Sequence, residues 1–198
     1  MTLQQALKNN LLSARHYLDI VINNDTYINN LVTVSQACVD TFNQKGKILI
    51  CGNGGSSSDA AHFAEELVGR YHKNRDPLPA LALSEPGVLT CIANDYSYSK
   101  IFSRQVEAFA NTNDIFIGLS TSGRSENIIE AFHKAKDLGL YTVLFLGKDG
   151  GDLKGRADTE FLIPGNHTDR IQEIHMLLLH MLVQSIERQL FPQLYENT

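Results

Sequence analysis

The chain has 198 residues, of which 43% are hydrophobic and 20% charged, values typical of a single globular domain with a sizeable core. Its formal net charge of −5 argues against non-specific binding to nucleic acid, which requires a basic face. No apolar stretch approaches the roughly 20 residues of a membrane span, and the N-terminus lacks the pattern of a secretory signal, so neither membrane nor nucleic acid is an expected partner.

Three widely spaced cysteines, Cys38, Cys51 and Cys91, form no C-x-x-C motif. They predict reduced thiols in a cytoplasmic protein. A catalytic thiol at Cys51, which ends a predicted strand, is the minor alternative.

The predicted elements alternate between helices and strands after a helical beginning. Two helices are expected first, at roughly 3–23 and 27–44, and the first has an amphipathic stripe formed by Leu3, Leu7, Leu11, Ala14, Leu18 and Val21. Short apolar runs then predict five strands, at 47–51, 80–83, 114–119, 141–146 and 159–163. Helical stretches separate them, and a last long helix is expected at 169–190.

Continuous apolar strands that alternate with helices indicate a parallel sheet covered on both faces. The sequence therefore predicts an α/β protein, a three-layer α/β/α sandwich with a five-stranded parallel sheet. We expect one domain over 1–198, with an N-terminal helical segment (1–45) and an α/β core with the C-terminal helix (46–198).

Two of the predicted strands end in loops rich in glycine and serine. The first loop spans 52–59, and the second, Ser-Thr-Ser-Gly-Arg-Ser at 120–125, precedes a helix near Glu126. Because the carboxyl ends of parallel strands meet at one edge of a sheet, both loops should lie there. Backbone N–H groups and hydroxyls at a helix start suit a phosphate group. The alternative for the second loop is a serine-rich helix cap, although one cap needs one hydroxyl rather than four.

A helix predicted at 60–71 carries His62 and Glu66 one turn apart on the same ridge. Such a pair can bind a metal ion or exchange protons, although a His/Glu pair on a helix flank is usually a solvated contact. Its position one turn after a phosphate-type loop strengthens the interpretation as a functional site.

The last helix is apolar nearly all round, so we expect it to be buried. Glu173, His180 and Gln184 share its one polar stripe, and Gln172 lies about 80° away. The residues alone leave open whether Gln172 or Glu173 joins His180 to complete a site begun on the 60–71 helix. A hydrogen-bonded interface network is the alternative.

Five segments together resemble one known family: 51–56 (CGNGGS), 62–71 (HFAEEL followed by GRY), 93–95 (AND), 120–123 (STSG) and 170–175 (RIQEIH). In this order and spacing, over almost the whole chain, the sequence resembles the sugar isomerase (SIS) fold, and within it the sedoheptulose 7-phosphate isomerases, or phosphoheptose isomerases. The resemblance implies a flavodoxin-like SIS domain that assembles as a homotetramer. It also implies conversion of D-sedoheptulose 7-phosphate to D-glycero-D-manno-heptose 7-phosphate, the first step toward the ADP-heptoses of lipopolysaccharide cores and surface glycans.

The resemblance further implies roles for individual residues. A zinc ion, one per subunit, would be bound by His62, Glu66, Gln172 and His180, which favours Gln172 over Glu173. The substrate would contact Asn53, Gly54, Gly55, Glu66, Asn94, Asp95, Ser120, Thr121, Ser122, Ser125 and Gln172. The four hydroxyls from 120–125 would hold its phosphate, and Asn94 and Asp95, in the loop after the second strand, would touch the sugar. The chain departs from common members at Ser57, Ser58 and Ala61, positions that can tune binding.

This aldose–ketose isomerisation needs a base for the C1 proton and an acid for the carbonyl oxygen, with an enediol between substrate and product. Glu66 is the candidate base and His180 the candidate acid. Because neither can shuttle protons freely while committed to a metal, zinc is catalytic, structural or displaced during turnover.

Two other functions are compatible with the same loops. One is a non-catalytic SIS-domain binding protein, similar to the bacterial replication-initiator-associating factor, but such binders lack equivalents of Glu66 and His180. The other is an isomerase of a different sugar phosphate, which the same phosphate loop would serve.

Overall fold

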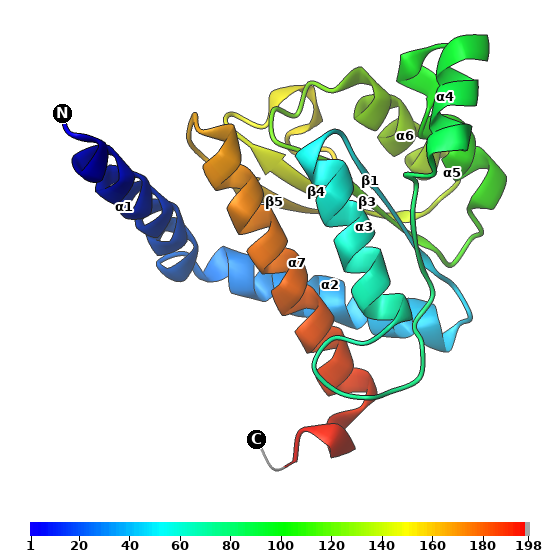
Figure 1. Ribbon diagram of the computed structural model, residues 1–198. Coiled ribbons are helices and arrows are strands. Elements are labelled where there is room, and N and C mark those ends of the chain that lie inside the picture. Colours follow the sequence, from blue (N-terminus) through cyan, green and yellow to red (C-terminus); the bar gives the residue numbers. More distant parts are fainter. Residues whose placement is uncertain (197–198) are drawn as a thin grey trace.

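The computed structural model describes residues 1–196 and has at its centre one sheet of five parallel strands (Figure 1). The strands run in the order β2-β1-β3-β4-β5 and comprise β1 (Ile48–Gly52), β2 (Ala80–Ala82), β3 (Ile115–Ser120), β4 (Tyr141–Gly147) and β5 (Thr159–Ile163). Every residue of β1 and β3 is buried, as their continuous apolar runs require. The predicted α/β sandwich is confirmed.

Helices cover both faces of the sheet. One face carries α2 (Asp25–Asn43), α3 (Gly55–Val68) and α7 (Thr168–Leu190), and the other carries α4 (Pro86–Asp95), α5 (Ser103–Phe109) and α6 (Glu126–Asp137). Alternate residues of β1 supply the two cores, because Ile48 and Ile50 pack on the α3–α7 side whereas Leu49 and Cys51 pack on the α6 side. Helix α1 (Leu3–Ile22) projects away from this body (Figure 1).

The short 3₁₀ turns η1 (Tyr98–Lys100), η2 (Gly151–Leu153) and η3 (Pro192–Leu194) complete the described elements. No helix in residues 1–196 is long and apolar enough to cross a membrane. No disulfide joins the three cysteines, which are free thiols, and Cys38 and Cys51 are buried. Burial raises the pKa of the Cys51 thiol far above its ordinary value, which argues against a catalytic thiolate there.

The helix predicted at 60–71 begins earlier than expected, at Gly55, and ends at Val68. Gly54, with φ +55°, turns the chain directly into the helix, so the serines expected in the turn lie within the first helical turns. A side chain at Gly52 would place its Cβ 2.6 Å from the Ser56 carbonyl oxygen, so glycine is required where helix and strand meet. Local propensity favoured a longer loop, and tertiary packing overrides it.

Asn94 and Asp95 were predicted in the loop after the second strand. This is wrong, because they are the last two residues of α4. This helix starts with Pro86 in its first turn, and the Glu85 carboxylate accepts a hydrogen bond from the Val88 N–H at 2.6 Å. The cap satisfies the start of the helix, and Ile92 anchors the helix in the core on the α6 side of the sheet.

Candidate active site

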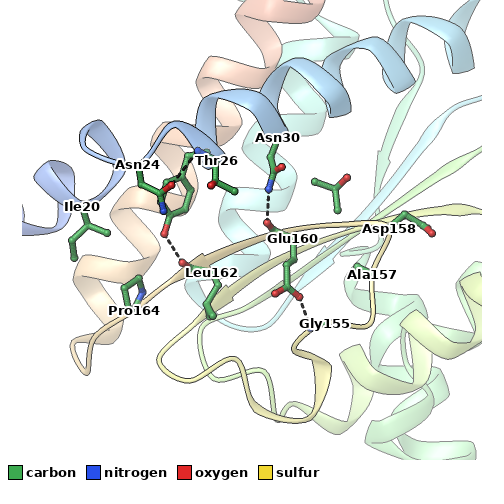
Figure 2. Close-up of a pocket in the computed structure, with 12 residues that line it drawn as sticks. Ile20, Asn24, Thr26, Asn30, Gly155, Ala157, Asp158, Glu160, Leu162 and Pro164 are labelled. Atoms are coloured by element: carbon green, nitrogen blue, oxygen red, sulfur yellow. Dashed lines mark hydrogen bonds between the residues drawn. The ribbon is translucent and has the colours of Figure 1, made fainter.

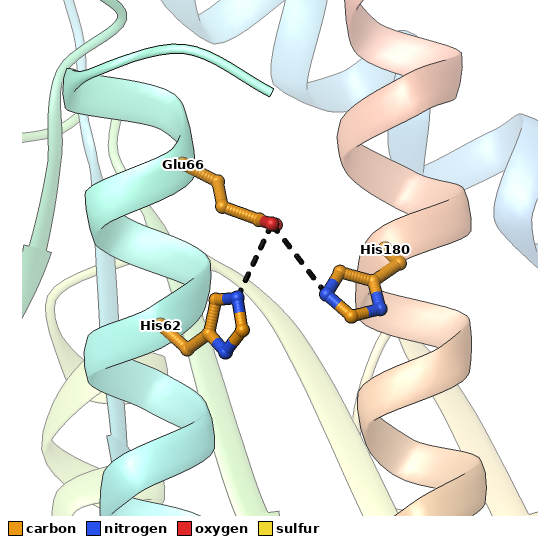
Figure 3. A group of neighbouring side chains, drawn as sticks. All are labelled: His62, Glu66 and His180. Atoms are coloured by element: carbon orange, nitrogen blue, oxygen red, sulfur yellow. Dashed lines mark ion pairs between the residues drawn. The ribbon is translucent and has the colours of Figure 1, made fainter. Parts of the chain in front are cut away.

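Helices α3 and α7 lie side by side and bring three titratable side chains together (Figure 3). His62 and Glu66 come from α3, and His180 comes from α7. One carboxylate oxygen of Glu66, Oε1, lies 3.2 Å from His62 Nε2 and 3.5 Å from His180 Nε2. Glu66 is only 9% exposed, and its other oxygen, Oε2, is buried with no hydrogen-bond partner among the described residues.

This group has the dimensions of a metal site. One possible ligand atom from each of the three residues lies within 4.8 Å of the others. Ligands about 2.0–2.1 Å from a tetrahedral zinc ion are about 3.3 Å apart, and the measured 3.2 and 3.5 Å lie on either side of that value. A buried carboxylate oxygen without a partner is costly unless a cation neutralises it. The group can therefore hold a metal ion.

Gln172, rather than Glu173, reaches α3. Its Nε2 donates a hydrogen bond to Asp59 Oδ1 at 3.2 Å, and its amide packs on Gly55, where a Cβ would lie only 2.5 Å from the amide atoms. Glu173 instead pairs with Arg170 at 2.8 Å, and its side chain is 52% exposed. Of the two residues that the sequence left open, Gln172 is thus the one whose side chain lies beside α3, and its part in the site stays a prediction.

The two glycine- and serine-rich loops lead from the neighbouring strands β1 and β3 into α3 and α6. No described side chain caps either helix: Gly54 occupies the N-cap of α3, and the Ser125 hydroxyl at the N-cap of α6 accepts no cap hydrogen bond. Ser120 Oγ donates a hydrogen bond to Ser125 Oγ at 3.3 Å and accepts one from the Gly123 N–H at 3.0 Å. Neither helix start thus has the serine cap of the alternative interpretation. At α3 the Ser56, Ser57 and Ser58 N–H groups donate to the Asn53 and Gly54 carbonyls, whereas an uncapped start such as that of α6 suits an anion.

Comparison with known proteins identifies the family. The SIS domain model matches residues 14–147. A phosphoheptose isomerase from Fusobacterium nucleatum is 53% identical over 162 residues, which are 82% of this chain and 84% of that relative. One from Sodalis glossinidius is 43% identical over 191 residues, 96% of this chain and 98% of the relative. The solved structure of a phosphoheptose isomerase from Francisella tularensis has a TM-score of 0.90 at 33% identity and covers 95% of this chain and 100% of its own.

The chain belongs to the phosphoheptose isomerase family. It is a sugar-phosphate isomerase, so the predicted function is confirmed and the non-catalytic binding protein is not supported. The residues described above are therefore the candidate active site of a phosphoheptose isomerase.

Asn53 is held in place by two residues that the sequence analysis missed. Its amide exchanges two hydrogen bonds with the buried Asn127 amide, each 2.8 Å, and its Oδ1 also accepts from the Tyr98 hydroxyl at 3.0 Å. The Tyr98 contact brings the segment after α4 against the β1 loop. Asn94 and Asp95 at the end of α4 are exposed and bonded to each other at 2.8 Å.

Asp59 is a third residue that the sequence analysis missed. Burial raises the pKa of its carboxyl, and the Gln172 hydrogen bond and the His62 and His180 imidazoles partly offset this shift. Its Oδ2 is buried without a hydrogen-bond partner among the described residues. The only signal in the sequence was its place on α3 one turn before His62, a spacing that surface residues also show.

A cavity of about 640 Å³ lies away from these residues (Figure 2). It runs between α1, α2 and the edge strand β5, and no predicted site residue lines it. At its floor, the Asn30 amide donates to the Glu160 carbonyl at 2.9 Å and the Tyr27 hydroxyl donates to the Leu162 carbonyl at 2.5 Å. Side chains of α2 thus occupy carbonyl groups on the open edge of the sheet, which protects the edge from pairing with other strands.

Proposed function

We propose that this phosphoheptose isomerase converts D-sedoheptulose 7-phosphate to D-glycero-D-manno-heptose 7-phosphate through an enediol, with Glu66 as the base and His180 as the acid. The observation that carries the proposal is the buried Glu66 carboxylate, which faces imidazoles from two helices at 3.2 and 3.5 Å. An isomerase assay over a panel of pentose, hexose and heptulose phosphates tests it. Turnover of another sugar phosphate in preference to sedoheptulose 7-phosphate would contradict it.

The two residues account for every proton that moves. Glu66 takes a proton from C1 of the ketose, and the freed electron pair forms the C1=C2 double bond while the carbonyl oxygen at C2 takes a proton from His180. In the second half, Glu66 returns its proton to C2, and the C1 hydroxyl gives its proton to His180 as the C1 aldehyde forms. Both residues then regain their starting protonation states, so the cycle needs no external acid or base.

We further propose zinc as the metal, one ion per subunit, held by His62, Glu66, Gln172 and His180. Its contacts with Glu66 and His180 would have to be released while these two residues exchange protons with the substrate. Two imidazoles and a carboxylate are ordinary zinc ligands, whereas the amide oxygen of Gln172 is a weak and exchangeable one. When bound, the ion supplies Lewis-acid stabilisation of negative charge on the substrate oxygen.

Removing the metal is expected to abolish most of the activity. Protein purified without added metal should contain about one zinc per chain, and dialysis against a chelator followed by zinc addition should remove and restore turnover. The His62→Gln variant should fold but retain substoichiometric zinc, because it loses one strong ligand. A metal-free wild type that turns over at the full rate would refute the role of zinc, and a fall in melting temperature without a fall in kcat would identify a structural ion.

For the substrate, we propose that Ser120, Thr121, Ser122 and Ser125 bind the phosphate. The sugar would be contacted by Asn53, Gly54, Gly55, Asn94 and Asp95, with Glu66 and Gln172 beside the reacting carbons. The start of α6 supports this division, since no side chain among the described residues caps it and a phosphate group fits at such a helix start.

Replacing Ser125 with alanine is expected to raise KM about tenfold and to leave kcat nearly unchanged. A hydrogen bond to the charged phosphate is present equally in the substrate complex and the transition state, so its loss weakens binding without slowing chemistry. Steady-state kinetics check this, with Ser185→Ala on α7 as the control, because within residues 1–196 the Ser185 hydroxyl bonds only to the Met181 carbonyl of its own helix. A fall in kcat with KM unchanged would contradict the assignment.

We also propose that the chain forms a homotetramer through α1. The apolar stripe predicted for this helix exists but remains largely exposed in the single chain, with Leu3 76%, Leu7 56% and Leu11 73% exposed. An exposed apolar stripe on a projecting helix marks an interface (Figure 1). Analytical ultracentrifugation tests this assembly.

We place the enzyme in the cytoplasm, because the buried thiols Cys38 and Cys51 are free. Its product would feed ADP-heptose and lipopolysaccharide synthesis.

A further inference from the structure

A buried ion pair joins the two helices that carry the reacting side chains, about two helical turns from His180. Arg75, in the segment between α3 and β2, and Glu187, on α7, have side chains that are both 0% exposed. Arg75 Nε donates to Glu187 Oε1 at 2.9 Å. The proton transfers and metal ligands proposed above use neither side chain, so the pair has no role assigned there.

Arg75 binds the end of α3 at the level of Glu66. Its Nη2 donates to the backbone carbonyl of Glu66 itself at 2.6 Å, and its Nη1 donates to the carbonyls of Leu67 at 2.6 Å and Gly69 at 3.2 Å. The last carbonyls of a helix have no partner within the helix, and the last turn of α3 contains no basic residue. Arg75 therefore supplies from outside the cation that this helix end lacks, and it does so on the residue whose carboxylate faces the imidazoles.

Glu187 holds the other side of the connection. It lies seven residues after His180 on α7, which puts the two side chains on the same face of the helix. Its Oε1 also accepts from the Tyr71 N–H at 3.4 Å, and its Oε2 accepts from the Tyr195 hydroxyl at 2.6 Å. The Tyr71 ring in turn stacks on the His180 imidazole, with centroids 5.7 Å apart and planes 18° apart.

A buried ion pair contributes little to stability compared with apolar side chains of the same size, and its best-documented use is to fix the register of packed elements. Here the elements are α3 and α7, and the register decides whether Glu66 and His180 meet. We propose that Arg75 and Glu187 are positioning residues that set the distance between Glu66 and His180 by joining the end of α3 to α7. The proposal rests on the roles given above to Glu66 and His180.

The test compares Glu187→Gln with a matched control elsewhere in the chain. Asp114 is equally buried, at 0% side-chain exposure, and accepts from Lys47 Nζ at 2.6 Å and from the Lys47 and Asn111 N–H groups at 2.8 Å each. Asp114→Asn therefore removes a buried charge from a similar network, at the amino end of the sheet, away from the site. The milder Arg75→Lys keeps the buried positive charge but cannot reach Glu187 and three carbonyls at once.

Each variant is assayed at a temperature at which circular dichroism shows it folded, for kcat, for KM and for the affinity of the metal-free protein for Co²⁺ by its visible absorption. Glu187→Gln and Arg75→Lys are expected to lower kcat and Co²⁺ affinity about ten- to a hundredfold, with KM nearly unchanged, because supporting residues of a metal site act on this scale. Asp114→Asn should change neither, even at a similar loss of melting temperature. Unchanged kcat and Co²⁺ affinity in the folded variants, or equal losses in Asp114→Asn, would overturn the proposal. An inactive wild type would contradict the catalytic roles of Glu66 and His180, whereas Co²⁺ affinity would still decide the positioning role.

Discussion

Replacing Glu66 with glutamine is expected to lower kcat for sedoheptulose 7-phosphate at least about a hundredfold. The amide has nearly the same shape as the carboxylate but cannot take a proton from C1, so the loss falls on the chemical step. A hundredfold corresponds to about 2.7 kcal/mol of transition-state stabilisation. Because the phosphate loop is untouched, KM should change much less than kcat.

The neighbouring Glu65 provides the control for this variant. It also lies near His62, at 3.9 Å, but its side chain is 72% exposed and forms no ion pair with His180 among the described residues. Glu65→Gln should therefore keep kcat within about twofold, since surface substitutions rarely disturb a site. Normal turnover in Glu66→Gln, or equal losses in both variants, would refute the assignment of the base.

The fold was predictable because its signals are local and repeated. Runs such as 115–119 and 143–146 are apolar at every position, and only a strand buried on both faces uses such a run. The parallel direction of the strands then follows from the helices that connect them. The start of α3 was not predictable, because Gly55 and the serines after it have poor helix propensity and are held by packing on β1 and by Gly54 at its positive φ.

The site was predictable in part. His62 and Glu66 are linked by helical spacing, so their pairing could be inferred from α3 alone. His180 lies more than a hundred residues later, and only the packing of α7 on α3 brings it to Glu66. Family resemblance indicated this connection and favoured Gln172, whereas helical periodicity did not decide between Gln172 and Glu173.

The supporting residues gave no signal that distinguishes them from surface residues. Asp59, Asn127 and Arg75 are ordinary polar residues in sequence, and each acquires its role from partners that are distant in the chain. Arg75 lies in a segment that reads as a polar loop, yet its side chain is completely buried. Such residues are found only when the partners of buried polar groups are traced in three dimensions.

Replacing His180 with glutamine is expected to lower kcat at least about a hundredfold. It blocks a different proton transfer from the one that Glu66 performs. Glutamine can still present an oxygen to a metal ion, but it cannot protonate the carbonyl oxygen at C2. The decisive comparison is therefore between turnover and metal content. If the acid role is correct, a His180→Gln protein loaded with zinc in excess remains slow, whereas a residue that acts only as a ligand would regain its rate when the site is filled.

His72 offers a control for the loss of an imidazole. Its ring stacks on Tyr71 at a centroid distance of 3.9 Å, on the same aromatic ring that contacts His180 at 5.7 Å, but it makes no ion pair with Glu66 among the described contacts. His72→Gln thus perturbs the Tyr71 stack without removing the group that faces the carboxylate, and it should retain kcat within a few fold. A comparable loss in His72→Gln would show that the effect at position 180 comes from packing on Tyr71. A loss confined to His180→Gln that persists at saturating zinc would mean that the second half of the site, supplied by α7, moves a proton as well as binding an ion.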